Sequence, residues 1–251
     1  MSCQGHAPII DSRTDPVTTS WADMRQAIAA VLILTATPVF AECRIEHSQQ
    51  RNADGSAIRI RQKQCEDSDV RAIRVQLKPA GSMQYTTVLR HTQSVEDAGT
   101  GGGRLRDIDG DGVFEYEEVG ACGTGPNCEG WIFKIKKNQR SMYLFFHDGY
   151  ADFRRMSNYY VTSGRASCCS WEHHVYIKPQ TERSIGERGF LYSITAGSTS
   201  ENRADGTPCY VSKRIRGKWV SSVIPDKRLL ELCEIYGTSY IINPPTEVED
   251  R

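Results

Sequence analysis

Short segments in which apolar and polar residues alternate recur along the chain, with turn residues between them. Residues 56–61 and 70–77 alternate in this way, as strands with one buried face do. Residues 83–89 are rich in β-type side chains, and glycine lies in the connections at 54–55 and 79–82, where turns require it. The pattern predicts an antiparallel meander.

Strand-like segments continue at residues 114–119, 130–135, 142–146, 159–161 and 174–177. Residues 99–103 are rich in glycine and are predicted to form a loop. The segment 226–236 has a helical pattern, with its leucines on one side, and Gly237 is expected to end that helix. We therefore expect a mainly β protein: an antiparallel meander or sandwich-like domain with a small C-terminal α+β portion.

The domain organisation follows from the same segments. The glycine-rich loop and a turn at 185–188 are the expected seams, and a boundary is expected near Lys178. This divides the mature chain into a β-rich domain over 42–178 and a C-terminal α+β subdomain over 179–251.

The N-terminal region has the features of a secretory signal peptide at residues 24–41. Arg25 precedes an apolar run over 27–34, and the small residues Val39 and Ala41 stand where a signal peptidase cuts. The run is shorter than the roughly 20 residues of a membrane helix, so no membrane span is expected in the mature chain. Residues 1–23 are acidic and are interpreted as an untranslated or non-native extension. The sequence predicts a periplasmic or secreted protein.

Cleavage after Ala41 would remove Cys3 and leave an even number of cysteines: Cys43, Cys65, Cys122, Cys128, Cys168, Cys169, Cys209 and Cys233. In an exported chain this predicts disulfides. Cys43 and Cys65 bracket a predicted hairpin, so we pair them. Cys209 and Cys233 would join a strand to the C-terminal helix, so we pair them too.

The adjacent pair Cys168-Cys169 allows two interpretations. The preferred one joins these residues to Cys122 and Cys128 by disulfides. The alternative is a site for zinc or copper that also uses His173 and His174, although the spacing matches no common zinc signature.

Composition limits the kinds of partner. Lysine plus arginine and aspartate plus glutamate each number 31, so the net charge is zero, and neither nucleic acid nor an anionic membrane is an expected partner. Binding must then come from a local site. A protein or cell-surface partner of unknown identity is expected alongside any ion.

One segment, residues 107–118, carries a specific ligand pattern. Its aspartates alternate, so a tightly coiled loop can turn three carboxylates toward one point, and a glycine permits the sharp bend. Hard oxygen ligands in this number suit calcium, which takes about 6–8 of them. The predicted metal ligands are the side chains of Asp107, Asp109, Asp111, Glu115 and Glu118 and the backbone carbonyl of Val113.

The spacing matches the EF-hand loop, but its flanks do not, because glycines precede and follow it where helices would be required. The segment more closely resembles the D-x-D-G-D-G loops of integrin-like FG-GAP repeats in secreted bacterial proteins. A short motif that follows such loops in some exported β proteins is similar to residues His147-Asp-Gly-Tyr-Ala-Asp-Phe153. The resemblance implies a structural calcium ion held by Asp107, Asp109, Asp111, Glu115 and the carbonyl of Val113. The alternative is a solvated acidic turn without metal.

Catalytic signatures such as G-x-S-x-G, H-E-x-x-H and S-x-x-K do not occur in the sequence. We therefore favour a calcium-stabilised binding or structural module over an enzyme. The alternative from another class is a secreted hydrolase whose site is assembled around His147, His173 and His174.

The signal-peptide interpretation can be tested at the N-terminus. The exported protein should begin at Glu42, because Val39 and Ala41 have signal-peptidase spacing. Edman sequencing or intact mass measurement of the exported protein checks this. Finding residues 1–23 still attached would contradict both the expected start at Met24 and cleavage after Ala41.

Overall fold

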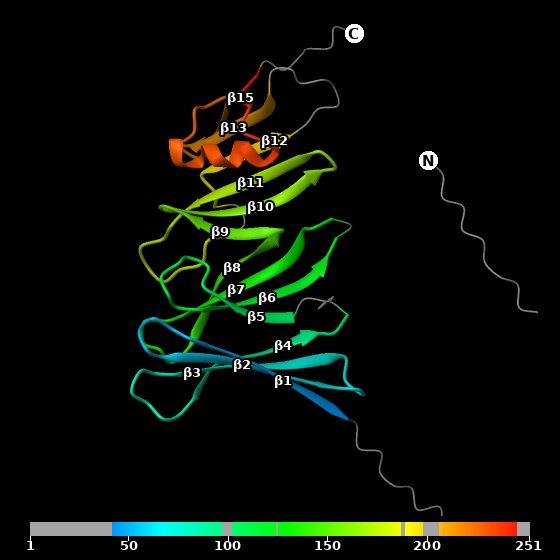
Figure 1. The fold of residues 1–251 in the computed structure, drawn as a ribbon, viewed down its shortest axis with the longest axis vertical. Helices are drawn as coiled ribbons and strands as arrows, with labels where there is room; N and C mark the ends of the chain where they lie inside the picture. Colours follow the sequence, from blue (N-terminus) through cyan, green and yellow to red (C-terminus); the bar gives the residue numbers. More distant parts are fainter. Residues whose placement is uncertain (1–41, 97–101, 124, 187–188, 198–205, 245–251) are drawn as a thin grey trace, which may run out of the picture. The chain divides into compact units, whose positions relative to one another are not determined.

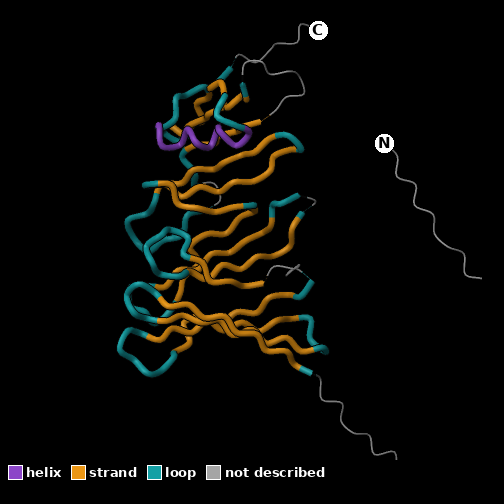
Figure 2. The backbone as a smooth tube through the Cα atoms, viewed as in Figure 1, coloured by secondary structure: helices purple, strands orange, loops and turns teal. Residues whose placement is uncertain are grey.

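The computed structural model describes residues 42–96, 102–123, 125–186, 189–197 and 206–244. Within these ranges the chain is mainly β, with antiparallel sheets, as expected from the alternating pattern. The expected signal peptide and the preceding extension lie outside the described residues. Figures 1 and 2 show the sheets following one another along the chain, with the helical segment beside the last of them.

The first sheet is a four-stranded meander in which each strand pairs with the next in sequence. Its strands are β1 (Cys43–Arg51), β2 (Ala57–Cys65), β3 (Val70–Lys78) and β4 (Thr86–Ser94). The second sheet repeats this arrangement with β5 (Gly102–Arg106), β6 (Glu115–Cys122), β7 (Cys128–Ile135) and β8 (Met142–Tyr150).

The third sheet holds the remaining strands, which are β9 (Asp152–Met156), β10 (Tyr159–Ser167), β11 (Ser170–Ile177), β12 (Tyr192–Gly197), β13 (Thr207–Ile215), β14 (Lys218–Ser221) and β15 (Tyr240–Ile242). β15 pairs in parallel with β13, and all other pairs in this sheet are antiparallel. β11 and β12 lie on either side of residue 178 and pair directly. The sheet is therefore continuous across the expected domain boundary.

The predicted helix is present as a 3₁₀ helix, η1 (Lys227–Tyr236). The side chain of Asp226 caps its first turn by accepting from the backbone N–H of Arg228, and Gly237 follows its last residue, as expected. Leu229, Leu232 and Cys233 are buried against the third sheet. The spacing of three between Leu229 and Leu232 fits the tighter turn of a 3₁₀ helix.

The second sheet is covered on both faces. One apolar cluster joins it to the first sheet and includes Ile58, Val75 and Tyr116, while another joins it to the third sheet and includes Ile132 and Phe153. Four consecutive residues at the start of β6 are buried for this reason: Glu115, Tyr116, Glu117 and Glu118. A strand covered on one face would alternate between buried and exposed residues.

The predicted glycine-rich loop needs a correction. Gly102 and Gly103 belong to β5, which pairs with β6, whereas residues 99–101 lie outside the described part. A Cβ atom on Gly103 would lie 2.3 Å from the ring of Tyr116, so only glycine allows the ring to cross the strand here. Gly103 therefore provides space for a buried aromatic side chain.

Two disulfides agree with the predicted pairs, Cys43–Cys65 and Cys209–Cys233. The predicted links from Cys168 and Cys169 to Cys122 and Cys128 are wrong, because Cys122 and Cys128 pair with each other. They stand opposite one another at the loop end of the β6–β7 hairpin, so their thiols meet within one hairpin. Among the described helices, none is long and apolar enough to cross a membrane.

His173 on β11 is buried in the third sheet, with 2% of its surface exposed and its Nδ1 2.8 Å from Ser163 Oγ. Burial, assisted by the nearby guanidinium of Arg154, lowers the pKa of the imidazole to about 4. The unfolded chain binds a proton at His173 near pH 6.5, whereas the folded chain does not. This neutral histidine therefore favours folding above about pH 6.5, and that contribution is lost as the pH falls toward about 4.

The replacement His173→Gln should flatten the dependence of stability on pH. Between about pH 7 and pH 4 the wild type should lose up to roughly 3 kcal/mol more unfolding free energy than the variant. Urea titrations at several pH values measure the difference. His47→Gln on exposed β1 is the control and should retain the wild-type profile. Parallel profiles for wild type and His173→Gln would contradict the assignment.

Candidate metal centre

The loop between β5 and β6 is folded around its own carboxylates. The carboxylate of Asp107 accepts backbone hydrogen bonds from Asp111 at 3.1 Å and from Gly112 at 3.0 Å. The carboxylate of Asp111 accepts from the backbone N–H of Val113 at 2.8 Å. Gly112 has a φ of +82°, which favours glycine, so the sharp bend predicted from the sequence is present.

The turn between β1 and β2 holds this loop in place. The backbone N–H of Ala53 donates to the carbonyl of Gly112 at 2.8 Å, and the buried side chain of Asn52 accepts from the backbone N–H of Phe114 at 3.0 Å. The C-terminal part of the loop is therefore attached to the turn between β1 and β2. Loop geometry and the packing of the first sheet are coupled through these contacts.

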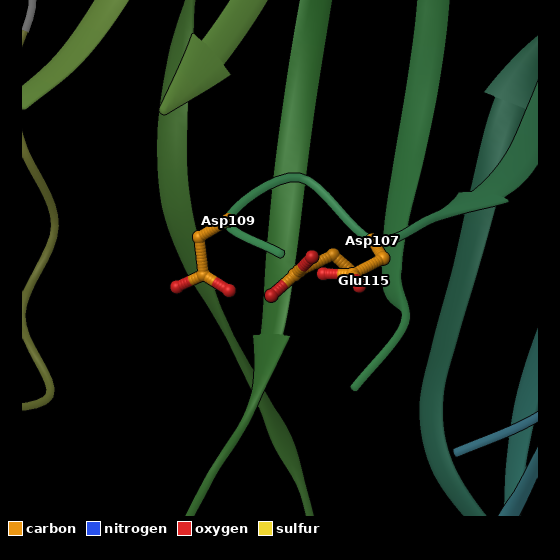
Figure 3. Close-up of side chains that lie close together, drawn as sticks. All are labelled: Asp107, Asp109 and Glu115. Atoms are coloured by element: carbon orange, nitrogen blue, oxygen red, sulfur yellow. The ribbon is translucent and has the colours of Figure 1, made fainter. Parts of the chain in front are cut away.

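Three carboxylates of the loop region come together: Asp107, Asp109 and Glu115 (Figure 3). One oxygen from each lies within 4.8 Å of the others. Oxygens on opposite sides of a calcium ion are separated by about 4.6–5.2 Å, twice the usual calcium–oxygen distance. Asp109 and Glu115 are 5% and 3% exposed, so solvent screens their mutual repulsion only weakly.

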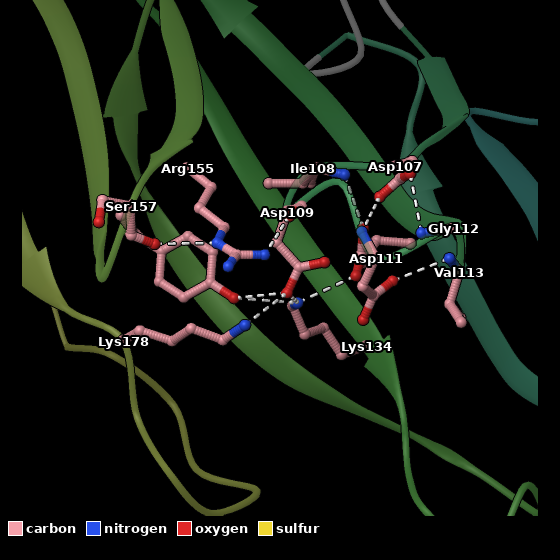
Figure 4. A network of polar contacts seen from close by, with 12 residues as sticks. Asp107, Ile108, Asp109, Asp111, Gly112, Val113, Lys134, Arg155, Ser157 and Lys178 are labelled. Carbon is pink, nitrogen blue, oxygen red and sulfur yellow. Dashed lines mark hydrogen bonds and ion pairs between the residues drawn. The ribbon is translucent and has the colours of Figure 1, made fainter.

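The ammonium group of Lys134 on β7 partly neutralises this cluster. Its Nζ lies 2.9 Å from Asp109 Oδ2 and 2.9 Å from Glu115 Oε1 (Figure 4). Tyr160 on β10 donates to the same Asp109 oxygen at 2.8 Å, and Lys178 Nζ lies 3.7 Å from it. Three strands or connections outside the loop thus converge on one oxygen of Asp109.

The other oxygen of Asp109 is different. Oδ1 is buried and has no hydrogen-bond partner within the described part of the chain. The dashed contacts in Figure 4 reach only one carboxylate oxygen of Asp109. A buried acceptor without a partner costs about 1–3 kcal/mol, and such an atom in a carboxylate cluster could contact a metal ion.

The pKa values reflect these contacts. Burial alone would raise the pKa of Asp109, but Lys134 and the hydrogen bond from Tyr160 outweigh it and hold that pKa at about 2. For Glu115 burial is the largest effect and raises the pKa to about 7, although Lys134 and the backbone N–H of Ile108 oppose it. Asp109 is therefore a carboxylate at neutral pH, and its charge is available to a cation.

The structure brings only some of the six predicted ligands together. Asp107, Asp109 and Glu115 form the cluster, while Asp111 and Val113 lie in the same bend with the contacts described above. Glu118 is not brought to the cluster: its carboxylate contacts His91 Nε2 at 3.2 Å and the hydroxyl of Tyr116 at 3.0 Å. Glu115 and Glu118 are three apart on one strand and so point to opposite faces of the sheet.

Lys134 and Tyr160 were not anticipated as members of this site. The sequence does contain a signal for Lys134, which is the single charged residue in the strand segment 130–135. A lone lysine in an apolar strand usually requires a buried acidic partner. Tyr160 carries no comparable signal, because nothing local indicates which sheet its hydroxyl faces.

The histidines of the alternative sites are held in separate places. His147 Nε2 lies 2.9 Å from Glu129 Oε1, and His174 Nε2 lies 3.1 Å from Glu172 Oε1. His173 faces Ser163 within the third sheet, as described above. Cys168 and Cys169 belong to an exposed turn, and the described residues bring no thiol–imidazole cluster together.

Comparison with known proteins does not place the chain in a family. No family model, no curated protein and no solved structure matches it. The class that fold and site define is therefore a mainly β, disulfide-bonded protein with a buried acidic cluster that could hold a metal ion.

Lys134 should be important for stability when no metal is present. Replacing it with methionine leaves Asp109 and Glu115 buried without their main cation, although Lys178 stays near Asp109. Loss of one partner of a buried ion pair costs about 3–5 kcal/mol. We expect Lys134→Met to lower the free energy of unfolding in EDTA by about 3 kcal/mol, measured by urea denaturation. Exposed Lys137→Met is the control, and equal losses in both variants would contradict this role.

Proposed function

We propose that this chain is an exported, disulfide-bonded protein that binds one calcium ion at Asp107, Asp109 and Glu115, and that the ion stabilises the fold. The observation that carries the proposal is the buried Oδ1 of Asp109, which has no partner within the described residues and belongs to a cluster of three carboxylates. A divalent cation would supply the missing contact. The resemblance to calcium loops of FG-GAP repeats supports the same ligands.

The choice of calcium follows from the ligand chemistry. The cluster offers carboxylate oxygens and no thiolate or imidazole, which favours a hard cation over zinc or copper. Calcium tolerates irregular arrangements of ligands, whereas magnesium requires a nearly octahedral shell. Asp111 and the carbonyl of Val113 lie in the same loop and could supply further oxygen ligands, and water would complete the shell.

Lys134 and the ion would use different oxygens of Asp109. The ammonium contacts Oδ2, so the ion would be bound through Oδ1 on the other side of the carboxylate. Lysine and calcium can then neutralise the cluster together. Because Lys134 already pairs with two of the three carboxylates, we expect the protein to fold without metal and calcium to add to its stability.

The ion would act on structure because of what the loop joins. The bend is attached to the β1–β2 turn at Ala53 and Asn52 and leads directly into β6. Fixing it would strengthen the contact between the first and second sheets. No pair of helices flanks the loop, so the opening motion of calcium-sensor proteins has no counterpart here.

The compartment is consistent with this role. Three disulfides indicate an oxidising environment outside the cytoplasm. A signal peptide at 24–41 would deliver the chain to the periplasm or the medium. Calcium is bound by extracellular modules with dissociation constants of about 10⁻⁴–10⁻³ M, a range that suits a structural site.

Calcium should raise the melting temperature of the wild-type protein. At about 10 mM calcium and a dissociation constant of about 1 mM, binding adds about 1.4 kcal/mol, which corresponds to a rise of roughly 3–6 °C for a chain of this size. Differential scanning calorimetry in calcium and in EDTA measures the shift. Asp109→Asn should abolish the shift because it removes the charge at the ligand.

Glu118→Gln is the matched control, since it alters a buried acidic residue of β6 that points to the face opposite Glu115 and the cluster. It should keep the calcium-dependent shift even if its own melting temperature falls. Identical melting of the wild type in calcium and EDTA would overturn the proposal. So would a shift that survives Asp109→Asn and disappears in Glu118→Gln.

A further inference from the structure

The turn between β10 and β11 consists of two adjacent cysteines. Ser167 and Ser170 pair across the ends of these strands, so Cys168 and Cys169 form the whole connection. Both side chains are exposed, and neither belongs to the three disulfides. The cysteines therefore lie at the tip of a hairpin.

The two sulfurs are held unusually close. Their Sγ atoms are 2.8 Å apart, which is longer than the 2.03–2.05 Å of a disulfide bond. The distance is nevertheless well below the separation of about 3.5–4.0 Å at which even the smaller carbon atoms rest against each other. The side chains therefore already point toward each other, as formation of a bond requires.

The backbone of the turn is fixed by its flanking serines. Ser167 Oγ accepts from the backbone N–H of Cys169 at 3.3 Å and lies 2.6 Å from Ser170 Oγ. Neither cysteine has a positive φ, whereas the common two-residue hairpin turn of type I′ requires positive φ at both positions. The hairpin therefore does not have a type I′ turn at Cys168 and Cys169, the two residues whose sulfurs lie close together.

Space for a reagent lies beside Cys168. A cavity of about 460 Å³ is lined by Cys168, Arg165 and Asn127, together with Gly123 and Gly125 of the loop that Cys122 and Cys128 close. A small thiol can therefore approach Cys168 along one side. By contrast, Cys209 and Cys233 are completely buried.

We infer that Cys168 and Cys169 form a thiol–disulfide exchange site: a vicinal disulfide in the oxidised protein that small thiols open to a dithiol. On oxidation each thiol gives up a proton, and a bond forms between the two sulfurs. The two electrons pass to an oxidant that is itself a disulfide. Its S–S bond breaks, and each of its two sulfurs takes up one of the protons. The reduced pair offers two neighbouring sulfur ligands, which suit a thiophilic ion such as trivalent arsenic.

Peptide mapping tests the closed form. Trypsin releases residues 166–183 as one peptide that contains Cys168 and Cys169 and no other cysteine. The exported protein is denatured in the presence of N-ethylmaleimide, without reductant, and digested with trypsin. The three other disulfides are verified in the same sample. We expect most of this peptide to be unlabelled and lighter than the dithiol form by two hydrogen atoms. Labelling of both cysteines in most of the peptide, or linkage to another peptide, would overturn the inference.

Two variants and a reduction series complete the test. In Cys168→Ser, N-ethylmaleimide should label Cys169 without reductant. In Cys43→Ser, it should label Cys65 and leave peptide 166–183 unlabelled. In native wild type, dithiothreitol should open the Cys168–Cys169 pair at a lower concentration than Cys209–Cys233, and phenylarsine oxide should then block its labelling. Opening of the buried pair first, or labelling unaffected by phenylarsine oxide, would count against an exchange site.

Discussion

Burial of the second sheet on both faces is the constraint on which the rest of the structure depends. β6 carries three glutamates, and coverage by the first and third sheets leaves each of them almost without solvent. Each therefore needs a partner inside the protein: Lys134 for Glu115, Arg104 and Tyr150 for Glu117, and His91 and Tyr116 for Glu118. Glu115 belongs to the acidic cluster, in which Oδ1 of the neighbouring Asp109 has no hydrogen-bond partner among the described residues.

The alternating pattern was sufficient to predict the fold class and many strands. β2 and β3 bury one face, so their sequences show the period of two directly. β1 was missed because its side chains are polar and mostly exposed, and only its pairing with β2 makes it a strand. The division into three sheets could not be predicted, because it depends on which apolar faces meet.

The candidate site was predictable to the extent that it is local. The spacing of Asp107, Asp109 and Glu115 lies within nine residues and predicted their convergence. Lys134 and Tyr160 come from other strands, 25 and 51 residues away from Asp109, and only the packing of sheets brings them to it. Glu118 shows the opposite case: its position fits the linear motif, but the strand geometry turns its side chain away.

The meander topology has a consequence for how the protein is made. In the first two sheets every strand pairs with its neighbour in sequence, and the three disulfides span only 22, 6 and 24 residues. In an oxidising compartment each hairpin can therefore form and oxidise early, before later segments of the chain have folded. Such an order of events limits mispairing among the cysteines, because the correct partner is always the one already present or the next to appear.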